Sequence, residues 1–137
     1  MSRASEIIDK MFLNDPFSLW LGIQRIEEKP GEVTLELTVR NEMLNGFGIA
    51  HGGITYSLAD SALAFSANGH GIQSVSIETS ISHTKPVKEG DILRTHVVEE
   101  SLTSKIGIYS IIIFNQNKEK VALFKGTVYR NGKEWEV

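Results

Sequence analysis

The residues best suited to chemistry lie in one short stretch of the sequence. Residues 45–53 read Asn-Gly-Phe-Gly-Ile-Ala-His-Gly-Gly and lead directly into the segment that carries Asp60. The glycines permit unusual backbone angles and let a ligand approach the main chain closely. A helix that starts at Gly52 and Gly53 has unpaired N–H groups at the positive end of its dipole. Such groups can stabilise an oxyanion that develops on a carbonyl.

Both features also have a plainer interpretation. Asn45-Gly46 is a common turn pair and Gly52-Gly53 can be a simple joint between a loop and a helix, and the spacing alone favours this interpretation. Asp60 can lie on the exposed polar side of a helix or in an enclosed cleft. In a cleft, burial would raise the pKa of the carboxyl group and prepare it as a base or nucleophile. Periodicity does not choose between these two positions.

Asp60 must be positioned by a helix that we expect over about residues 53–68. Ile54, Leu58, Ala62 and Phe65 recur there at helical spacing, and further alanines widen the apolar surface. A helix that is apolar over most of its circumference must be covered on several sides. The sequence therefore requires other elements to surround this helix.

Alternating apolar and polar residues predict a β-sheet as that cover. We expect a short helix over about residues 5–13 and six strands, at residues 19–27, 32–40, 74–84, 92–100, 106–115 and 121–130. Short turns between the last three strands are typical of an antiparallel meander. The predicted fold class is α+β, with a highly curved antiparallel sheet wrapped around one long central helix, in a single domain over residues 1–137.

The composition narrows the function further. The chain has 137 residues, 41% apolar content, no cysteine and a net charge of −3. An acidic balance argues against a general nucleic-acid binder. No apolar run approaches the roughly 20 residues that cross a bilayer, and the N-terminus does not resemble a signal peptide. We therefore expect a cytoplasmic protein with neither a nucleic-acid partner nor a membrane partner.

Several common functional motifs are absent from the sequence. It contains no G-x-S-x-G elbow, no H-E-x-x-H and no P-loop. Gly46-Phe47-Gly48 begins like a dinucleotide fingerprint, but His51 stands where the third glycine should be. The four histidines show no helical metal pairing, so we predict no metal site. His70, His83 and His96 are interpreted as surface or strand-face residues.

The arrangement Asn45-Gly-x-x-x-x-His51-Gly52-Gly53, followed by Ser-Leu-Ala-Asp-Ser-Ala at residues 57–62, resembles a known signature. It is similar to that of the hotdog-fold acyl-CoA thioesterases of the phenylacetate-degradation (PaaI) type. The resemblance continues through Lys-Pro-Val-Lys-Glu-Gly-Asp at residues 85–91 and through residues 107–109, 115–116 and 121–126. It covers nearly everything after about residue 18.

The resemblance implies a role for each residue of the signature. Asp60 would be the catalytic carboxylate, as nucleophile or as base for water, and the Gly52 N–H would polarise the thioester carbonyl. Asn45 would position the water or the thioester, and His51 would orient the loop. Ser76 would hold water near Asp60. In this family the Asp and the Asn/Gly loop come from opposite subunits, which implies a homodimer, often assembled into a homotetramer.

The resemblance also implies an acyl-CoA substrate and no bound cofactor, because coenzyme A arrives as part of the substrate. The acyl group would be an aryl-acetyl group, similar to phenylacetyl, or a medium-length chain. Gly53 would join Gly52 in binding the substrate. The coenzyme A phosphates need cations, for which Lys85, Lys88 and Arg94 are candidates, although each also fits a solvated surface position.

Two other functions are compatible with such a fold. A hydratase or dehydratase would need an Asp-x-x-x-x-His pair, and Phe65 stands at that position after Asp60. A non-catalytic module that binds acyl-CoA would not need the Asn45, His51 and Asp60 set. Hydrolysis of a panel of acyl-CoA thioesters distinguishes a thioesterase from both alternatives.

Overall fold

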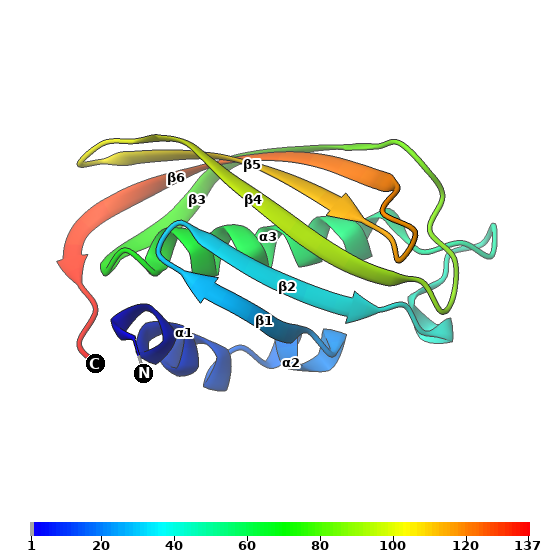
Figure 1. The fold of residues 1–137 in the computed structure, drawn as a ribbon, viewed down its shortest axis with the longest axis horizontal. Coiled ribbons are helices and arrows are strands. Elements are labelled where there is room, and N and C mark those ends of the chain that lie inside the picture. The colour runs from blue at the N-terminus through cyan, green and yellow to red at the C-terminus, as the bar shows by residue number, and fades with distance from the viewer. Residues whose placement is uncertain (1) are drawn as a thin grey trace.

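A computed structural model describes residues 2–137 and shows one antiparallel sheet curved around a long helix (Figure 1). The helices are α1 (Arg3–Leu13), α2 (Pro16–Leu21) and α3 (Gly52–Asn68), with a 3-10 turn η1 (Asn41–Met43). The strands are β1 (Gln24–Lys29), β2 (Glu32–Thr38), β3 (Ile72–His83), β4 (Ile92–Leu102), β5 (Ile106–Phe114) and β6 (Lys120–Glu134). Their order in the sheet is β1-β2-β4-β5-β6-β3. This arrangement confirms the predicted α+β hotdog architecture.

The apolar surface of α3 explains the curvature of the sheet. Leu58, Ala59 and Ala62 are fully buried on this helix, which contacts five strands as well as α1. The inward residues of β2 and β5 are also fully buried, among them Leu35 and Ile111. A flat sheet would leave part of the α3 circumference in water, so burial of the whole helix favours a sheet that wraps around it.

The side of α3 that the sheet leaves open is partly covered by α1. Ile7 and Ile8 of α1 are fully buried, and Phe12 packs edge-on against Phe65 of α3 with ring centroids 6.1 Å apart. Figure 1 shows α1 and α2 as a layer on the side of α3 opposite the main sheet. Among residues 2–137, we find no helix with both the length and the apolarity to cross a membrane.

The strand predicted over residues 19–27 was wrong in its first half. Residues 16–21 form α2, and β1 begins only at Gln24. The Asp15 side chain accepts a hydrogen bond from the Ser18 N–H, and Pro16 occupies the first turn, where its missing N–H has no cost. Gly22 ends the helix with a φ of 76°, which favours glycine. These end signals outweighed the strand propensity of Leu19 and Trp20.

Strand β3 lies at an edge of the sheet. It pairs with β6, and along its other side it has no strand partner within residues 2–137. This edge is long, and Val75 and Ile77 on it are 61% and 59% exposed. A long, exposed apolar edge is a template for pairing with a second chain.

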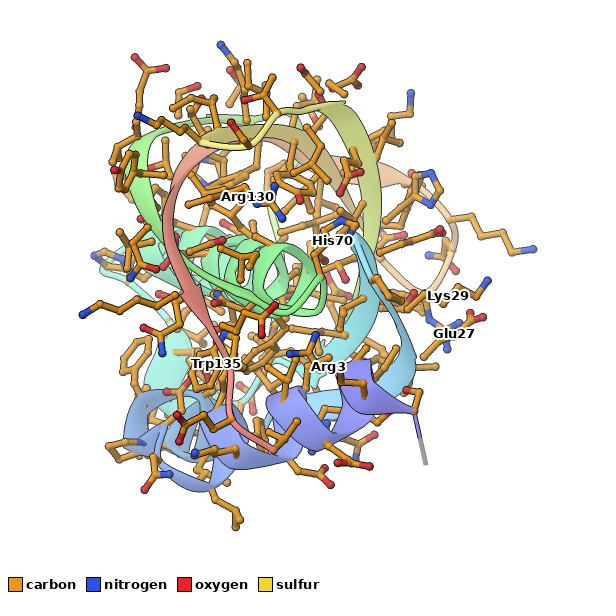
Figure 2. The ribbon with its side chains drawn as sticks, turned by 90° about the vertical axis from the view of Figure 1, so that its left-hand side faces the viewer. Arg3, Glu27, Lys29, His70, Arg130 and Trp135 are labelled. Atoms are coloured by element: carbon orange, nitrogen blue, oxygen red, sulfur yellow. The ribbon has the colours of Figure 1, made fainter. Side chains whose placement is uncertain are left out.

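Asn68 joins three segments where α3 ends. Its Nδ2 donates to the carbonyls of Ala64 and Ser74 at 2.8 and 3.0 Å. Its Oδ1 accepts from the Ser74 N–H at 2.9 Å and from the Trp135 indole at 2.8 Å. The carbonyl of Trp135 in turn accepts from Arg3 of α1, and Figure 2 shows these two side chains close to α1. Asn68 is almost fully buried, so its amide cannot exchange these partners for water.

We predict that Asn68→Leu lowers the free energy of unfolding by about 3 kcal/mol, because it leaves several buried polar groups without partners. Urea unfolding followed by circular dichroism measures the change. Gln24→Leu, at an exposed position on β1, is the control and should change stability by less than about 0.5 kcal/mol. Equal losses for the two variants would contradict this role for Asn68.

Candidate active site

The loop before α3 is organised by Asn45. Its side-chain Oδ1 accepts hydrogen bonds from the N–H groups of Phe47 at 2.9 Å and Ile49 at 3.4 Å. Its own N–H donates to the Ile49 carbonyl at 2.8 Å, and Gly48 has a φ of 78° within the turn. The Asn45 Oδ1 is therefore occupied by hydrogen bonds within the loop. The Asn45 Nδ2 has no partner within residues 2–137 and is available to a ligand.

His51 caps the N-terminus of α3. Its Nδ1 accepts from the Gly53 N–H at 2.9 Å, and its carbonyl accepts from the Ile54 N–H at 2.9 Å. The Gly52 N–H has no partner in the described part of the chain. Of the two glycines predicted to bind the substrate, Gly52 thus has an N–H that is free to bind a ligand, whereas the Gly53 N–H is hydrogen-bonded to His51.

A cavity of about 380 Å³ lies beside this turn. It is lined by Asn45, Gly52, Thr55, His83 and Lys85, among others. The structure therefore brings together three of the predicted site residues from the loop, the helix start and the segment after β3. A free backbone donor and a free side-chain amide at one cavity form a suitable place for a polarised carbonyl.

His83 was not predicted as part of this cavity. Its Nε2 lies 2.7 Å from Thr55 Oγ1, and Thr55 Oγ1 donates to the Gly52 carbonyl at 3.0 Å. The signal that could have found His83 is the two-residue alternation of β3. Counting on from the inward-facing Ile81, which is partly buried against the core, places His83 on the same face as Ile81.

Asp60 lies in a different cavity, of about 260 Å³. Its neighbours there include Met11, Leu63, Ala64 and Ser76. The carboxylate has no hydrogen bond or ion pair to the part of the chain that the structure describes. Burial raises the pKa of Asp60, and the negative charge of Asp15 raises it further. Of the two positions that the sequence left open for Asp60, the structure shows the one beside a cleft.

The neighbouring Ser61 belongs to a short hydrogen-bonded chain that the sequence did not suggest. Ser61 Oγ lies 2.8 Å from Ser18 Oγ, and Ser18 Oγ donates to Asp15 Oδ2 at 2.7 Å. This chain links α2 to α3 one residue after Asp60. It explains why Asp15 lies close enough to influence the pKa of Asp60.

Within one chain, the two halves of the predicted site do not meet. Gly52 and Asp60 are eight residues apart on α3, which corresponds to about 12 Å along the helix axis. They line separate cavities. Ser76 lines the Asp60 cavity, whereas Asn45 lines the Gly52 cavity.

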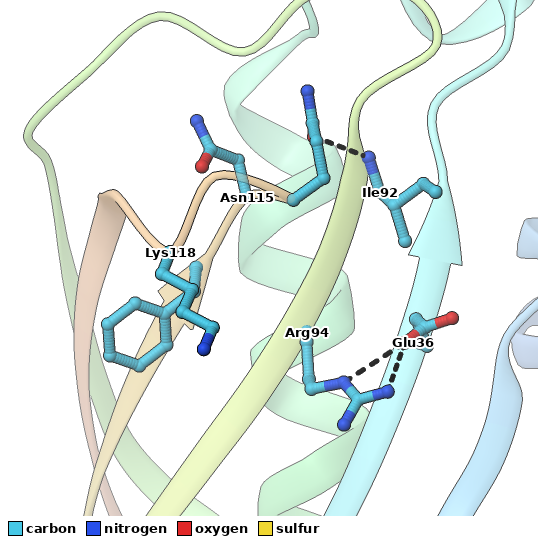
Figure 3. Close-up of a pocket in the computed structure, with 7 residues that line it drawn as sticks. Glu36, Ile92, Arg94, Asn115 and Lys118 are labelled. Carbon is cyan, nitrogen blue, oxygen red and sulfur yellow. Dashed lines mark hydrogen bonds and ion pairs between the residues drawn. The ribbon is translucent and has the colours of Figure 1, made fainter.

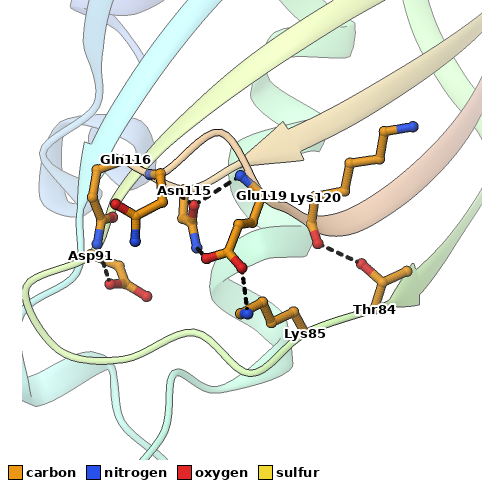
Figure 4. Close-up of polar contacts among 8 residues, drawn as sticks. Thr84, Lys85, Asp91, Asn115, Gln116, Glu119 and Lys120 are labelled. Atoms are coloured by element: carbon orange, nitrogen blue, oxygen red, sulfur yellow. Dashed lines mark hydrogen bonds and ion pairs between the residues drawn. The ribbon is translucent and has the colours of Figure 1, made fainter.

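The three cations predicted to bind the coenzyme A phosphates, Lys85, Lys88 and Arg94, lie at different places in the structure. Lys85 lines the Gly52 cavity and pairs with Glu119 at 2.6 Å, and Asn115 hydrogen-bonds to the same carboxylate (Figure 4). The Lys85 ammonium lowers the pKa of Glu119. Lys88 is exposed in the loop before β4, where its N–H donates to Asp91 at 2.9 Å.

Arg94 lies in a third cavity, of about 490 Å³, on the outer face of the sheet (Figure 3). Both its Nε and its terminal nitrogen donate to Glu36, at 3.0 and 2.7 Å. The structure does not bring Arg94 to Asn45 and Gly52. Within residues 2–137, no three His, Asp or Glu side chains gather in a way that could hold a metal ion.

Comparison with known proteins decides the family. Residues 47–122, which include the Gly52 turn and Asp60, match the model of the thioesterase superfamily. The chain belongs to the thioesterase superfamily. This assignment confirms the resemblance predicted from the residues around Asn45, His51 and Asp60.

Named relatives extend the comparison beyond the family model. The chain is 36% identical to the acyl-coenzyme A thioesterase PaaI of Escherichia coli, over 89% of this chain and 87% of the relative. It is 32% identical to the human acyl-coenzyme A thioesterase 13, over 72% and 74% of the two chains. The solved structure of the E. coli PaaI protein from the phenylacetic acid degradation operon superimposes with a TM-score of 0.93, at 34% identity and 96% coverage of both chains.

For this superfamily member we predict that Asp60→Asn stabilises the fold at pH 7 and loses that advantage in acid. Because the pKa of Asp60 is raised on folding, the folded state binds the proton more readily than the unfolded state. Stability therefore falls as the pH rises from the ordinary Asp pKa of about 3.9 through the raised value. The amide has no such dependence.

Urea unfolding of both proteins at pH 7 and at about pH 4 measures this difference. The gap in unfolding free energy between Asp60→Asn and the unchanged chain should be positive at pH 7 and smaller at pH 4. Glu100→Gln, at an exposed carboxylate on β4, is the control. A gap that is equal at both pH values would show that the pKa of Asp60 is not raised on folding.

Proposed function

We propose that this protein hydrolyses acyl-CoA thioesters to a free acid and coenzyme A, with Asp60 as the catalytic carboxylate. The half-buried Asp60 carboxylate carries this proposal, because it has a raised pKa and no hydrogen bond or ion pair within residues 2–137. An uncompensated buried carboxylate is costly for a fold to keep. Such a group is typical of a site where it reacts with a ligand. The names of the relatives from E. coli and human support the same substrate class.

The chemistry can follow either of two routes. As nucleophile, Asp60 attacks the thioester carbonyl carbon, the carbon–sulfur bond breaks and coenzyme A leaves as a thiolate; water then cleaves the resulting anhydride. As general base, Asp60 takes a proton from water, whose oxygen attacks the same carbon; the carbon–sulfur bond then breaks, and coenzyme A leaves as a thiolate. In both routes the carbonyl oxygen becomes negative, and the Gly52 N–H stabilises it. Asn45 Nδ2 holds the attacking water or the thioester.

We propose that each complete site forms between two copies of the chain. The separation of Asp60 from Gly52 by about 12 Å along α3 supports this arrangement. The free edge of β3 supplies a surface for a two-fold interface, in which each Asp60 would face the Gly52 and Asn45 of its partner. Two such dimers would form the homotetramer that the resemblance implies.

The acyl group that we propose is an aryl-acetyl group or a medium-length chain. Met11, Leu63, Ala64 and Val128 give the Asp60 cavity an apolar lining of modest size. Lys85 beside Gly52 and the exposed Lys88 are the proposed cations for the coenzyme A phosphates. We propose no further cofactor, since coenzyme A enters with the substrate.

The two alternative functions have less support. A dehydratase would need a histidine where Phe65 lies, and Phe65 is only 1% exposed in the core beneath α1. A module that merely binds acyl-CoA would gain nothing from an uncompensated Asp60. Turnover of acyl-CoA separates hydrolysis from binding alone.

We expect Asp60→Asn to reduce kcat by at least about 100-fold, because the amide is nearly isosteric but is neither basic nor nucleophilic. Release of coenzyme A, followed with a thiol reagent over acyl chains of different length and over phenylacetyl-CoA, measures kcat and KM. The chain contains no cysteine, so the reagent reports coenzyme A alone. Glu100→Gln, at an exposed position on β4, is the matched carboxylate-to-amide control and should keep the original rate. Near-normal turnover by a folded Asp60→Asn protein would remove Asp60 from the mechanism.

A further inference from the structure

Strand β3 reaches both halves of the proposed site. Ser76 lines the Asp60 cavity, and His83, at the end of the same strand, lines the Gly52 cavity. The imidazole of His83 lies directly against the Gly52 backbone. A Cβ built on Gly52 would lie only 3.1 Å from Cε1 of His83. The first turn of α3 is therefore held between its own loop and this ring.

Thr55 makes two polar contacts, one with the Gly52 carbonyl and one with the ring of His83. A threonine hydroxyl has a single proton to donate, and here it is donated to the Gly52 carbonyl at 3.0 Å. The contact of 2.7 Å between Thr55 Oγ1 and His83 Nε2 complements this bond when the imidazole carries its proton on Nε2 and donates it to the hydroxyl. In this tautomer a chain of donors runs from His83 through Thr55 to the Gly52 carbonyl.

Gly52 needs such a restraint. Glycine has the widest choice of backbone angles of any residue, and Gly52 is followed by a second glycine. His51 fixes the Gly53 N–H, but the Gly52 N–H has no partner within residues 2–137 that would hold its direction. The bond from Thr55 to the Gly52 carbonyl and the contact of His83 with the Gly52 backbone restrict the rotation of both adjoining peptides.

We propose that His83 is a positioning residue for the oxyanion donor: through Thr55, it holds the first turn of α3 so that the Gly52 N–H points at the thioester carbonyl. This inference rests on the acyl-CoA hydrolysis proposed above. Donors aligned in advance stabilise the transition state more than the ground state. Loss of the alignment therefore lowers kcat and leaves KM for the thioester nearly unchanged.

Three single variants and one double variant test the role. His83→Phe keeps a ring against Gly52 but removes the donor, whereas His83→Gln keeps an N–H donor near the position of Nε2. Thr55→Val removes the hydroxyl in a side chain of the same shape. We expect His83→Phe and Thr55→Val each to lower kcat about tenfold, with KM changed less than about twofold. His83→Gln should stay within about threefold of the original kcat.

The double variant His83→Phe/Thr55→Val should be no slower than either single variant, because all three break the same chain of donors. An unchanged kcat in His83→Phe overturns the proposal. A double variant about 100-fold slower, the product of two independent losses, overturns it as well. Unfolding by urea confirms that each variant is folded under the assay conditions.

A second measurement keeps this test separate from the test of the enzymatic function. In nitrogen-15 NMR spectra, the original protein should show His83 protonated on Nε2, and His83→Phe and Thr55→Val should shift the Gly52 amide resonance in the same direction. His83→Gln should leave that resonance near its original position. If the protein hydrolyses no thioester, the proposed function fails. The role of His83 is then supported or overturned by whether the Gly52 resonance shifts as described.

Discussion

Burial of one helix that is apolar almost all round is the constraint on which the structure depends. Leu58, Leu63 and Ala67 point in different directions from α3, and each is at most 2% exposed. A curved sheet covers most of the helix and α1 covers part of the remainder. Because the same helix begins at Gly52 and carries Asp60 in its third turn, its packing also sets the positions of both groups.

Because α3 carries both groups, the Gly52 N–H and the Asp60 carboxylate lie in separate cavities of one chain. At the start of α3, His51 occupies the Gly53 donor, while Gly52 keeps a free N–H beside Asn45. Further along, Asp60 lies where the cover is incomplete, in a cavity between α1 and β3. A rigid helix cannot bring positions eight residues apart onto one carbonyl, so the proposed mechanism requires a second chain. The exposed edge of β3 is the part of the fold that suits such pairing.

The fold was predictable because the spacing of apolar residues along the chain reflects which side of each helix or strand is buried. The helix at residues 52–68 and the alternation that begins at Val33 both follow from which side chains avoid water. Asn45, His51 and Asp60 were identified only through the resemblance of their order and spacing to a known family signature, because the spacing alone favoured a plain turn and helix start. Helix α2 was missed, because its signal is local: Asp15 caps a helix of only six residues, within a stretch whose composition suits a strand.

The remaining features depend on distances that no local pattern encodes. His83 and Thr55 are 28 residues apart and meet only because β3 ends above the first turn of α3. The pairing of Arg94 with Glu36 likewise follows from the register of β2 against β4, which places both on the outer face of the sheet. Sequence composition supplied Arg94 as a cation for coenzyme A but could not show that it lies away from Gly52.

Complementation between two inactive variants tests most directly whether the site is shared. Asp60→Asn and Asn45→Ala, each shown to refold alone and to remain inactive, are unfolded together in equal amounts and refolded. Random pairing makes about half of the dimers mixed, and each mixed dimer has one site with an intact Asp60 and an intact Asn45. A shared site therefore predicts recovery of about a quarter of the original activity per subunit, assuming independent sites. Activity that stays at the level of the parent variants, in a sample shown to contain mixed dimers, would contradict the shared site.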